Sequence, residues 1–196
     1  MIAIRCTGGP YPAKLAPMVE EARLEDSGAG LAPASEGWFV VNVADAAWLT
    51  NEAFGAACIF EGTGELWDVG FTIGVVWPDN PSALYHRESN QEDFLILSGE
   101  CLLLIEGDER PLEAWDYVHS PPETDHIFVG AGDGPCVIFM TGSRANEQRV
   151  VYPRSEVALR HGGGVETEAH SGREAYAPFQ RWKPGRPDFN GLPWAE

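Results

Sequence analysis

The chain has 196 residues, with 13 Lys and Arg against 30 Asp and Glu, which gives a formal net charge of -17. Nucleic acids and anionic membranes bind basic patches, so this charge argues against both as partners, although a local cationic site can still bind a small anion. The length suffices for one domain with extensions, and no apolar run is long enough to span a bilayer.

The N-terminal residues 1–6 lack the long apolar core of a signal peptide, so we expect a cytoplasmic protein. No two cysteines form a Cys-x-x-Cys pair, and three of the four lie in apolar runs that read as strands. This pattern is typical of free, buried thiols rather than of disulfides or zinc ligands. The four are Cys6, Cys58, Cys101 and Cys136.

Residues 1–37 are rich in Pro, Gly, Ala and acidic residues and are predicted to form an N-terminal arm, loosely structured or docked on a partner. Within it, residues 14–26 are compatible with a short acidic helix, which Pro17 limits.

Short apolar runs separated by Gly, Pro and Asp turns follow, and they predict an antiparallel sandwich or barrel over residues 38–141. Gly70 and Gly74 inside one run indicate bends or bulges. Leu95 and Leu97 make the second strand face apolar, so a second sheet or a second subunit is expected to cover it. The expected strands are 38–43, 56–60, 66–77, 83–88, 92–97, 101–105, 109–112, 117–118, 124–129 and 136–141.

Residues 142–196 are predicted to be a C-terminal extension. Residues 155–161 favour a short helix, with Ser155 as N-cap and Gly162 as the stop. The tail that follows has too many aromatic residues for a free chain, so we expect it to wrap the barrel or a neighbouring subunit.

A polar cluster lies in the middle of the barrel region. His86, Glu88 and Glu92 share one parity, so an extended chain turns them to one face together with Phe94. Burying two carboxylates is costly unless a positive charge lies between them, and a divalent metal supplies it. Further on, a proline turn at residues 121–122 leads His126 into another apolar strand.

These two stretches resemble the two motifs of the cupin family. The first reads His86-x-Glu88-x3-Glu92-x6-Gly99, with Glu88 where the family usually has a second His. Asn80 stands where the first motif usually opens with Gly. The second reads Trp115-x5-Pro121-x-Glu123-x2-His126, with Trp115 and Glu123 in place of Gly and Gly130 in place of Asn. The resemblance implies an all-β cupin double-stranded β-helix, a jelly-roll barrel with N- and C-terminal arms and little helix. Because cupins commonly pair through a sheet face, it also implies a homodimer.

The resemblance implies one divalent metal ion held by His86, Glu88, Glu92 and His126. Nitrogen and oxygen ligands suit Fe, Mn, Ni, Co or Zn. His86, His126 and Glu92 alone form the ligand set of two His and one carboxylate that non-heme iron oxygenases use. Glu88 is then either a fourth ligand or a nearby base. The alternative is a vestigial barrel in which these groups pair with Arg87 or water.

Aromatic residues are expected to wall the substrate pocket. Phe94 and Phe128 share the parity of the ligands, and Tyr85 and Phe71 are further candidates. His119 has the opposite parity to His126 and is predicted to be a rim or packing residue.

Four functions remain open for a small-molecule substrate. The first is a dioxygenase-like oxidoreductase in which Glu88 or Glu92 deprotonates the substrate. The second is a sugar isomerase or epimerase, which for a phosphorylated sugar needs a basic residue in the barrel. Arg87 and Arg110 are the only Arg or Lys residues between Arg23 and Arg144, which disfavours a phosphorylated sugar as the substrate. The others are a metal-dependent lyase or hydrolase and a non-catalytic ligand-binding module.

Overall fold

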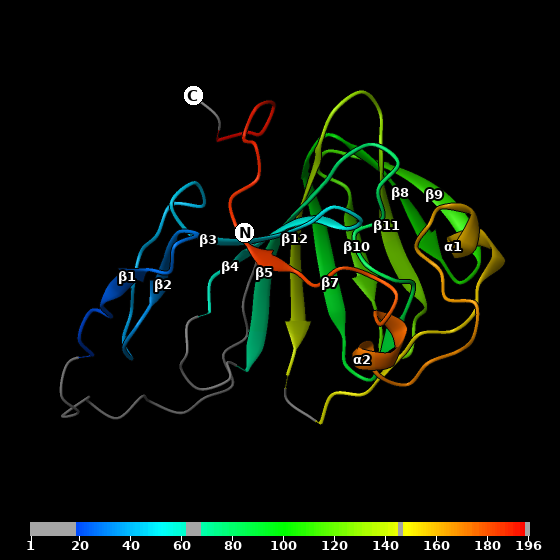
Figure 1. Ribbon diagram of the computed structural model, residues 1–196, viewed down its shortest axis with the longest axis horizontal. Coiled ribbons are helices and arrows are strands. Elements are labelled where there is room, and N and C mark those ends of the chain that lie inside the picture. The colour runs from blue at the N-terminus through cyan, green and yellow to red at the C-terminus, as the bar shows by residue number, and fades with distance from the viewer. Residues whose placement is uncertain (1–18, 62–67, 145–146, 195–196) are drawn as a thin grey trace, which may run out of the picture.

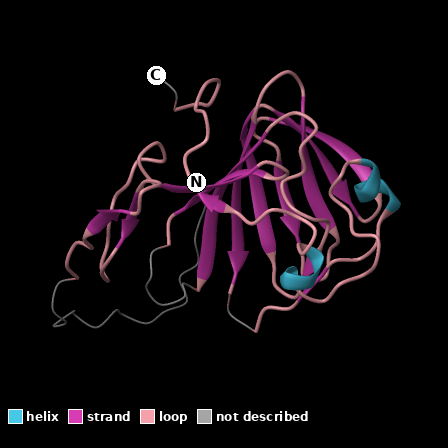
Figure 2. Ribbon diagram, in the orientation of Figure 1, coloured by secondary structure: helices cyan, strands magenta, loops and turns pink. Residues whose placement is uncertain are grey.

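Antiparallel strands dominate the structure, a computed structural model that describes residues 19–61, 68–144 and 147–194 (Figure 2). A large sheet has the strand order β10-β7-β12-β5-β4-β3-β14 and faces a smaller sheet of order β11-β8-β9. Two further pairs, β1-β2 and β13-β6, complete the sheets of the described chain. The protein is therefore all-β with a jelly-roll barrel, as predicted.

The elements have the following bounds. The strands of the large sheet are β3 (Ala47–Asn51), β4 (Gly55–Ile59), β5 (Val69–Val76), β7 (Glu92–Ser98), β10 (Tyr117–Ser120), β12 (Cys136–Ser143) and β14 (Lys183–Pro184). The smaller sheet holds β8 (Glu100–Ile105), β9 (Asp108–Glu113) and β11 (His126–Ala131). The short pairs are β1 (Leu24–Asp26) with β2 (Leu31–Pro33) and β6 (Arg87–Glu88) with β13 (Val150–Val151), and the helices are α1 (Glu156–Arg160) and α2 (Gly172–Ala175).

The core lies between the two sheets because each strand turns every second side chain inward. Phe94, Ile96 and Ile138 from the large sheet pack against Leu103 and Phe128 from the smaller one, all at 5 % exposure or less. This inward face continues toward Glu92, the first residue of β7. The polar residues of the site therefore lie at one end of an otherwise apolar barrel interior.

The C-terminal extension covers the outer faces of both sheets. Helix α1 begins after the N-cap Ser155 and ends before Gly162, as predicted, and its Val157 packs on Leu104 of the smaller sheet. The tail then crosses the large sheet, where the rings of Phe189 and Trp194 lie 5.9 and 5.8 Å from that of the fully buried Trp48. The chain's own extension thus performs much of the covering that we expected of a second sheet or subunit.

Three predictions about the N-terminal half are wrong. Residues 38–43 form no strand: Trp38 and Val40 are 53 % and 78 % exposed, and the tight turn between β3 and β4 makes Ala47–Asn51 the pairing partner instead. Residues 19–26 form no helix and contribute β1, while residues 14–18 lie outside the described chain. Gly70 and Gly74 keep β5 in continuous register with β12, whose own irregularity falls at Val137 instead, against β7.

The β1-β2 hairpin stands at the end of the large sheet remote from the two helices (Figure 1). Three cysteines, Cys58, Cys101 and Cys136, are buried and free, as predicted, and Cys6 lies outside the described residues. In the described chain, neither helix has the length or the apolar character to cross a membrane.

Candidate metal centre

Two histidines lie side by side on paired segments and point into the barrel interior. His86 and His126 form an antiparallel bridge in which each backbone N–H donates to the other's carbonyl, at 3.2 and 2.8 Å. Directly opposed residues of such a pair turn their side chains to the same face. Accordingly the two imidazole rings lie 5.1 Å apart, centroid to centroid.

Backbone carbonyls select the tautomer of both rings. Nδ1 of His86 lies 2.7 Å from the carbonyl oxygen of Leu84, and Nδ1 of His126 lies 2.9 Å from that of Thr124. A carbonyl can only accept, so Nδ1 carries the proton and Nε2 keeps its lone pair. This is the arrangement that orients metal-binding histidines in proteins.

Burial keeps both imidazoles uncharged. Removal from water lowers the pKa of His86. Burial, together with the neighbouring His86, lowers the pKa of His126 to about 4. Neutral imidazole is the form that binds a metal, so both rings are ready as ligands at neutral pH.

Glu92 supplies the third donor. It begins β7, paired with Gly142 on β12, and its Oε2 lies 3.4 Å from Nε2 of His126. Burial and the adjacent carboxylate of Glu88 raise the pKa of Glu92 to about 8. Because His126 is neutral as well, this contact is no ion pair. A buried carboxylate of this kind lacks a compensating positive charge.

The three donors fit one metal ion. Among the described residues, His86, Glu92 and His126 form the group whose ligand atoms all lie within 4.8 Å of one another. Ligand atoms about 2.1 Å from a common ion are separated by at most about 4.2 Å, so small side-chain movements close the site. The donor set and its spacing match a divalent transition metal.

The alternative that Arg87 neutralises the cluster is not what the structure shows. Its guanidinium donates to Asp125 at 2.9 Å and lies 3.5 Å from Glu123. Arg87 and Asp125 each adjoin one histidine, so strand alternation turns this ion pair to the opposite face of the same bridge. The pair braces the two histidine-bearing segments from outside the cavity.

Glu88 lies beside the three donors without joining them. It lines the same cavity, and its Oε2 accepts a hydrogen bond from Nε2 of Gln148. Burial raises its pKa, an effect that Gln148, His126 and Arg144 oppose. This placement favours the role of nearby base over that of a fourth ligand.

A cavity of about 300 Å³ opens at the cluster. Phe94 and Phe128 line it, with ring centroids 4.8 Å apart, and the ring of Phe94 lies 5.2 Å from that of His126. Small and polar residues of β5 and β12 form another wall. These are Gly70, Thr72, Thr141 and Gly142.

Tyr85 and Phe71, which we predicted in the pocket, lie outside it. Each adjoins an inward-facing residue, so strand alternation turns it outward. Tyr85 is buried against Leu104 and Val157 behind the smaller sheet, and its hydroxyl accepts the N–H of Gly107. Phe71 is 38 % exposed on the outside of the large sheet. His119 is also outside the cavity and contacts Asp93 at 2.7 Å, in line with its predicted rim position.

Comparison with known families agrees with this geometry. Residues 72–142 match the family model described as a cupin domain, and both motifs lie within the match. This chain carries a cupin domain. No curated protein matches the chain.

Solved structures with a similar fold include several cupins. A proposed sugar phosphate isomerase from Acidithiobacillus ferrooxidans is 28 % identical, with a TM-score of 0.43, over 45 % of this chain and 58 % of that one. A sugar phosphate isomerase from Silicibacter pomeroyi is 18 % identical, with a TM-score of 0.49, over 57 % and 79 %. A polyketide cyclase from Streptomyces resistomycificus is 16 % identical, with a TM-score of 0.47, over 55 % and 79 %. The chain thus spans less than two thirds of the first of these.

Sequence reasoning missed residues that reach the cupin cavity from outside the two motifs. Arg144 and Gln148 line it from the segment after β12. Tyr176, from the tail, accepts the N–H of Leu84 at 3.0 Å, and the carbonyl of Leu84 holds Nδ1 of His86. Neither periodicity nor motif spacing signals these residues, because each of them meets the site from a segment far away in the chain.

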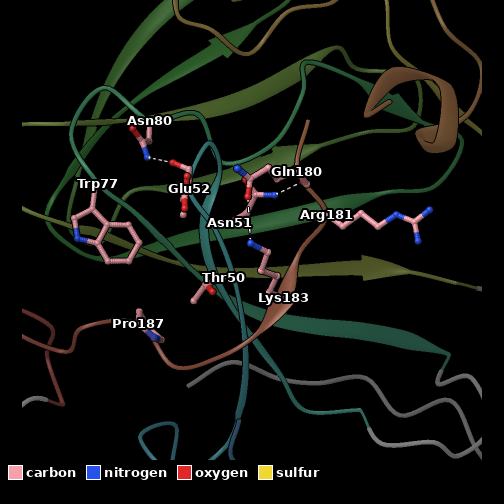
Figure 3. A pocket seen from close by; sticks show the side chains of 10 residues that line it. Thr50, Asn51, Glu52, Trp77, Asn80, Gln180, Arg181, Lys183 and Pro187 are labelled. Carbon is pink, nitrogen blue, oxygen red and sulfur yellow. Dashed lines mark hydrogen bonds between the residues drawn. The ribbon is translucent and has the colours of Figure 1, made fainter. Parts of the chain in front are cut away.

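A second cavity, of about 320 Å³, lies where β14 crosses β3 at the far end of the large sheet (Figure 3). Lys183 donates there to Gln180, while Arg181 extends away from the other labelled side chains. Its lining contains no histidine or cysteine and a single carboxylate, Glu52. Among the described residues, the candidate metal ligands therefore lie in the first cavity.

Proposed function

We propose that this cupin is a metal-dependent enzyme that acts on a small organic molecule. The observation that carries the proposal is the convergence of His86, His126 and Glu92 in one aromatic cavity, with both Nδ1 atoms engaged by carbonyls. A purely structural histidine pair would not need two lone pairs and a buried carboxylate at one point.

A divalent ion bound there would act as a Lewis acid toward a substrate oxygen and, in the case of iron, would support chemistry with O2. The protein's own groups supply the rest. Phe94 and Phe128 exclude water and hold the apolar part of the substrate. Glu88, lining the cavity with a raised pKa, can take a proton from a substrate hydroxyl or α-carbon.

Dioxygenase-like oxidation is the favoured reaction class. Two histidines and one carboxylate leave several coordination positions open, as in the non-heme iron oxygenases. Isomerisation of a carbonyl compound is the second candidate, because Arg144 supplies the basic group that the barrel strands lack. Both reactions use Glu88 as the base, and the metal distinguishes them.

Elemental analysis of the purified protein tests the proposal. We expect about one equivalent of a transition metal in the wild type and little in a His126→Ala variant. The matched control is His119→Ala, whose histidine is exposed and bonded to Asp93 outside the cavity. Iron with substrate-dependent O2 uptake supports oxidation, whereas zinc or another metal without O2 uptake supports isomerisation. A wild type that holds no metal and takes none up on titration contradicts the proposal.

A further inference from the structure

Arg144 is the one Arg or Lys side chain among the described residues that line the metal cavity. It directly follows β12, and its side chain is 31 % exposed. Every other ionisable group of the lining belongs to the cluster or is Glu88. The cavity therefore has an acidic, metal-binding side and a separate cationic position.

Three contacts hold Arg144 in place, two of them through its guanidinium. Nη1 donates to Oε2 of Glu61 at 2.7 Å, and the backbone N–H of Arg144 donates to the carbonyl of Asp68. The guanidinium also lies against Gly70, where a Cβ would come within 2.7 Å of Nη2 and 3.0 Å of the central carbon. The glycine in β5 thus makes room for the arginine against the cavity wall.

Arg144 and Glu88 line the same cavity, so the guanidinium lies on the wall of the pocket that also holds the proposed base. A guanidinium has five N–H donors, and the hydrogen bond to Glu61 uses one of them. A planar fork of this kind suits a carboxylate, which it can bind through two parallel hydrogen bonds.

We propose that Arg144 binds a carboxylate of the substrate, so that the substrate class is small organic acids whose other end reaches the metal. This inference rests on the proposed function, since it takes the metal centre as the second anchor. The cavity of about 300 Å³ limits the acid to a small one.

The competing explanation is that Arg144 only ties β12 to Glu61 as a structural ion pair. The two explanations differ in what Glu61→Gln and Arg144→Met do. A structural pair is lost equally in both variants. A carboxylate-binding arginine survives in Glu61→Gln, which keeps the guanidinium and a hydrogen-bond acceptor.

The test uses zinc-loaded protein and hydroxamates, which bind zinc through one end. Isothermal titration calorimetry compares acetohydroxamate with the monohydroxamates of malonate, succinate and glutarate, which add a carboxylate at increasing distance. We expect one carboxylated probe to bind wild type about 10- to 100-fold more tightly than acetohydroxamate. Arg144→Met should lose that preference and keep its affinity for acetohydroxamate, whereas Glu61→Gln should keep both.

Gly70→Ala provides a second variant in case Arg144→Met does not fold, because it displaces the guanidinium without removing it. It should also lose the preference. The inference is overturned if the wild type shows no preference for any carboxylated probe. It is also overturned if the preference survives in both Arg144→Met and Gly70→Ala. If zinc is not taken up, or acetohydroxamate does not bind, the proposed function fails and the inference falls with it.

Discussion

Oε2 of Glu92 lies 3.4 Å from Nε2 of His126, yet the two groups form no ion pair. Burial raises the pKa of the carboxyl to about 8 and lowers that of the imidazole to about 4, so both are uncharged at pH 7 without a metal. A divalent ion favours the ionised carboxylate and the neutral imidazole together. Metal binding, the protonation of Glu92 and the stability of the fold are therefore coupled at this contact.

The stability of the metal-free protein should fall as the pH rises from about 6.5 to 8. In this window the folded state still holds the proton of Glu92, whose ordinary pKa is 4.5, while the unfolded state has released it. His126 acts in the opposite direction, but only between its folded pKa of about 4 and its ordinary value of 6.5. The slope is at most about 1.4 kcal/mol per pH unit for one group.

Chemical denaturation of metal-free protein at several pH values checks this. Glu92→Gln, which cannot ionise, should lack the slope and be more stable than wild type at pH 8. Saturating metal should also remove the fall in wild type, because the bound form needs the carboxylate. A metal-free wild type whose stability is level or rises from pH 6.5 to 8 contradicts the raised pKa of Glu92.

Glu92 and Glu88 should differ in their effect on metal affinity. Glu92→Gln removes a donor and should lower the affinity more than about 100-fold. Glu88→Gln removes a neighbouring charge and should lower it no more than about tenfold, because Gln148 holds that carboxylate. Competition titration with a metal-binding dye measures both. Equal losses would make Glu88 a fourth ligand.

The tail should affect metal binding through Tyr176. Tyr176→Phe removes the acceptor of the Leu84 N–H, and Leu84 is fully buried, so we expect a loss of about 1–3 kcal/mol in stability. Because the Leu84 carbonyl orients His86, metal affinity should fall by up to about tenfold. Tyr117→Phe is the control, since its hydroxyl bonds Asp93 outside the cavity. If Tyr176→Phe lowers the stability but leaves the metal affinity unchanged, the tail only covers the barrel and does not support the metal site.

The surface left for the predicted homodimer is smaller than the whole outer face of the sheets. The tail and α1 cover much of the outer sheet faces, but Phe71, Trp115 and Tyr117 stay 38 %, 74 % and 64 % exposed. Tyr117 pairs with Leu95 and Leu95 with Phe139, and the ring of Phe139 stacks on Phe71, so the outer face of the large sheet is apolar here. Exposed apolar surface of this kind favours association.

Light scattering coupled to size exclusion measures the mass in solution, and we expect twice the chain mass at micromolar concentration. Phe71→Lys should shift it to the monomer. Val40→Lys is the control, since Val40 is also an exposed apolar residue but lies outside the strands of this sheet. A monomeric wild type would remove the dimer from consideration.

Local spacing was enough to predict the centre of the molecule. His86 and Glu88 face the same cavity, as alternation in an extended chain predicts, and Ser155 and Gly162 bound a helix for equally local reasons. The chain bends at residues 89–90, so Glu92 reaches that cavity from a separate strand, β7. The same alternation, applied strictly, places Tyr85 and Phe71 on the outside. The predictions for those two residues rested on aromatic character and are wrong for that reason.

Only the tertiary structure decided what depends on contacts between distant segments. The apolar run at 38–43 looks like a strand, but pairing went to Ala47–Asn51 because a tight turn brings it beside β4. Glu88 is separated from the three donors by a hydrogen bond to Gln148, 60 residues away in the chain. Arg144 lines the cavity because Glu61 binds its guanidinium and Gly70 has no side chain in its way. Such contacts depend on packing in three dimensions, which leaves no periodic signal in the sequence.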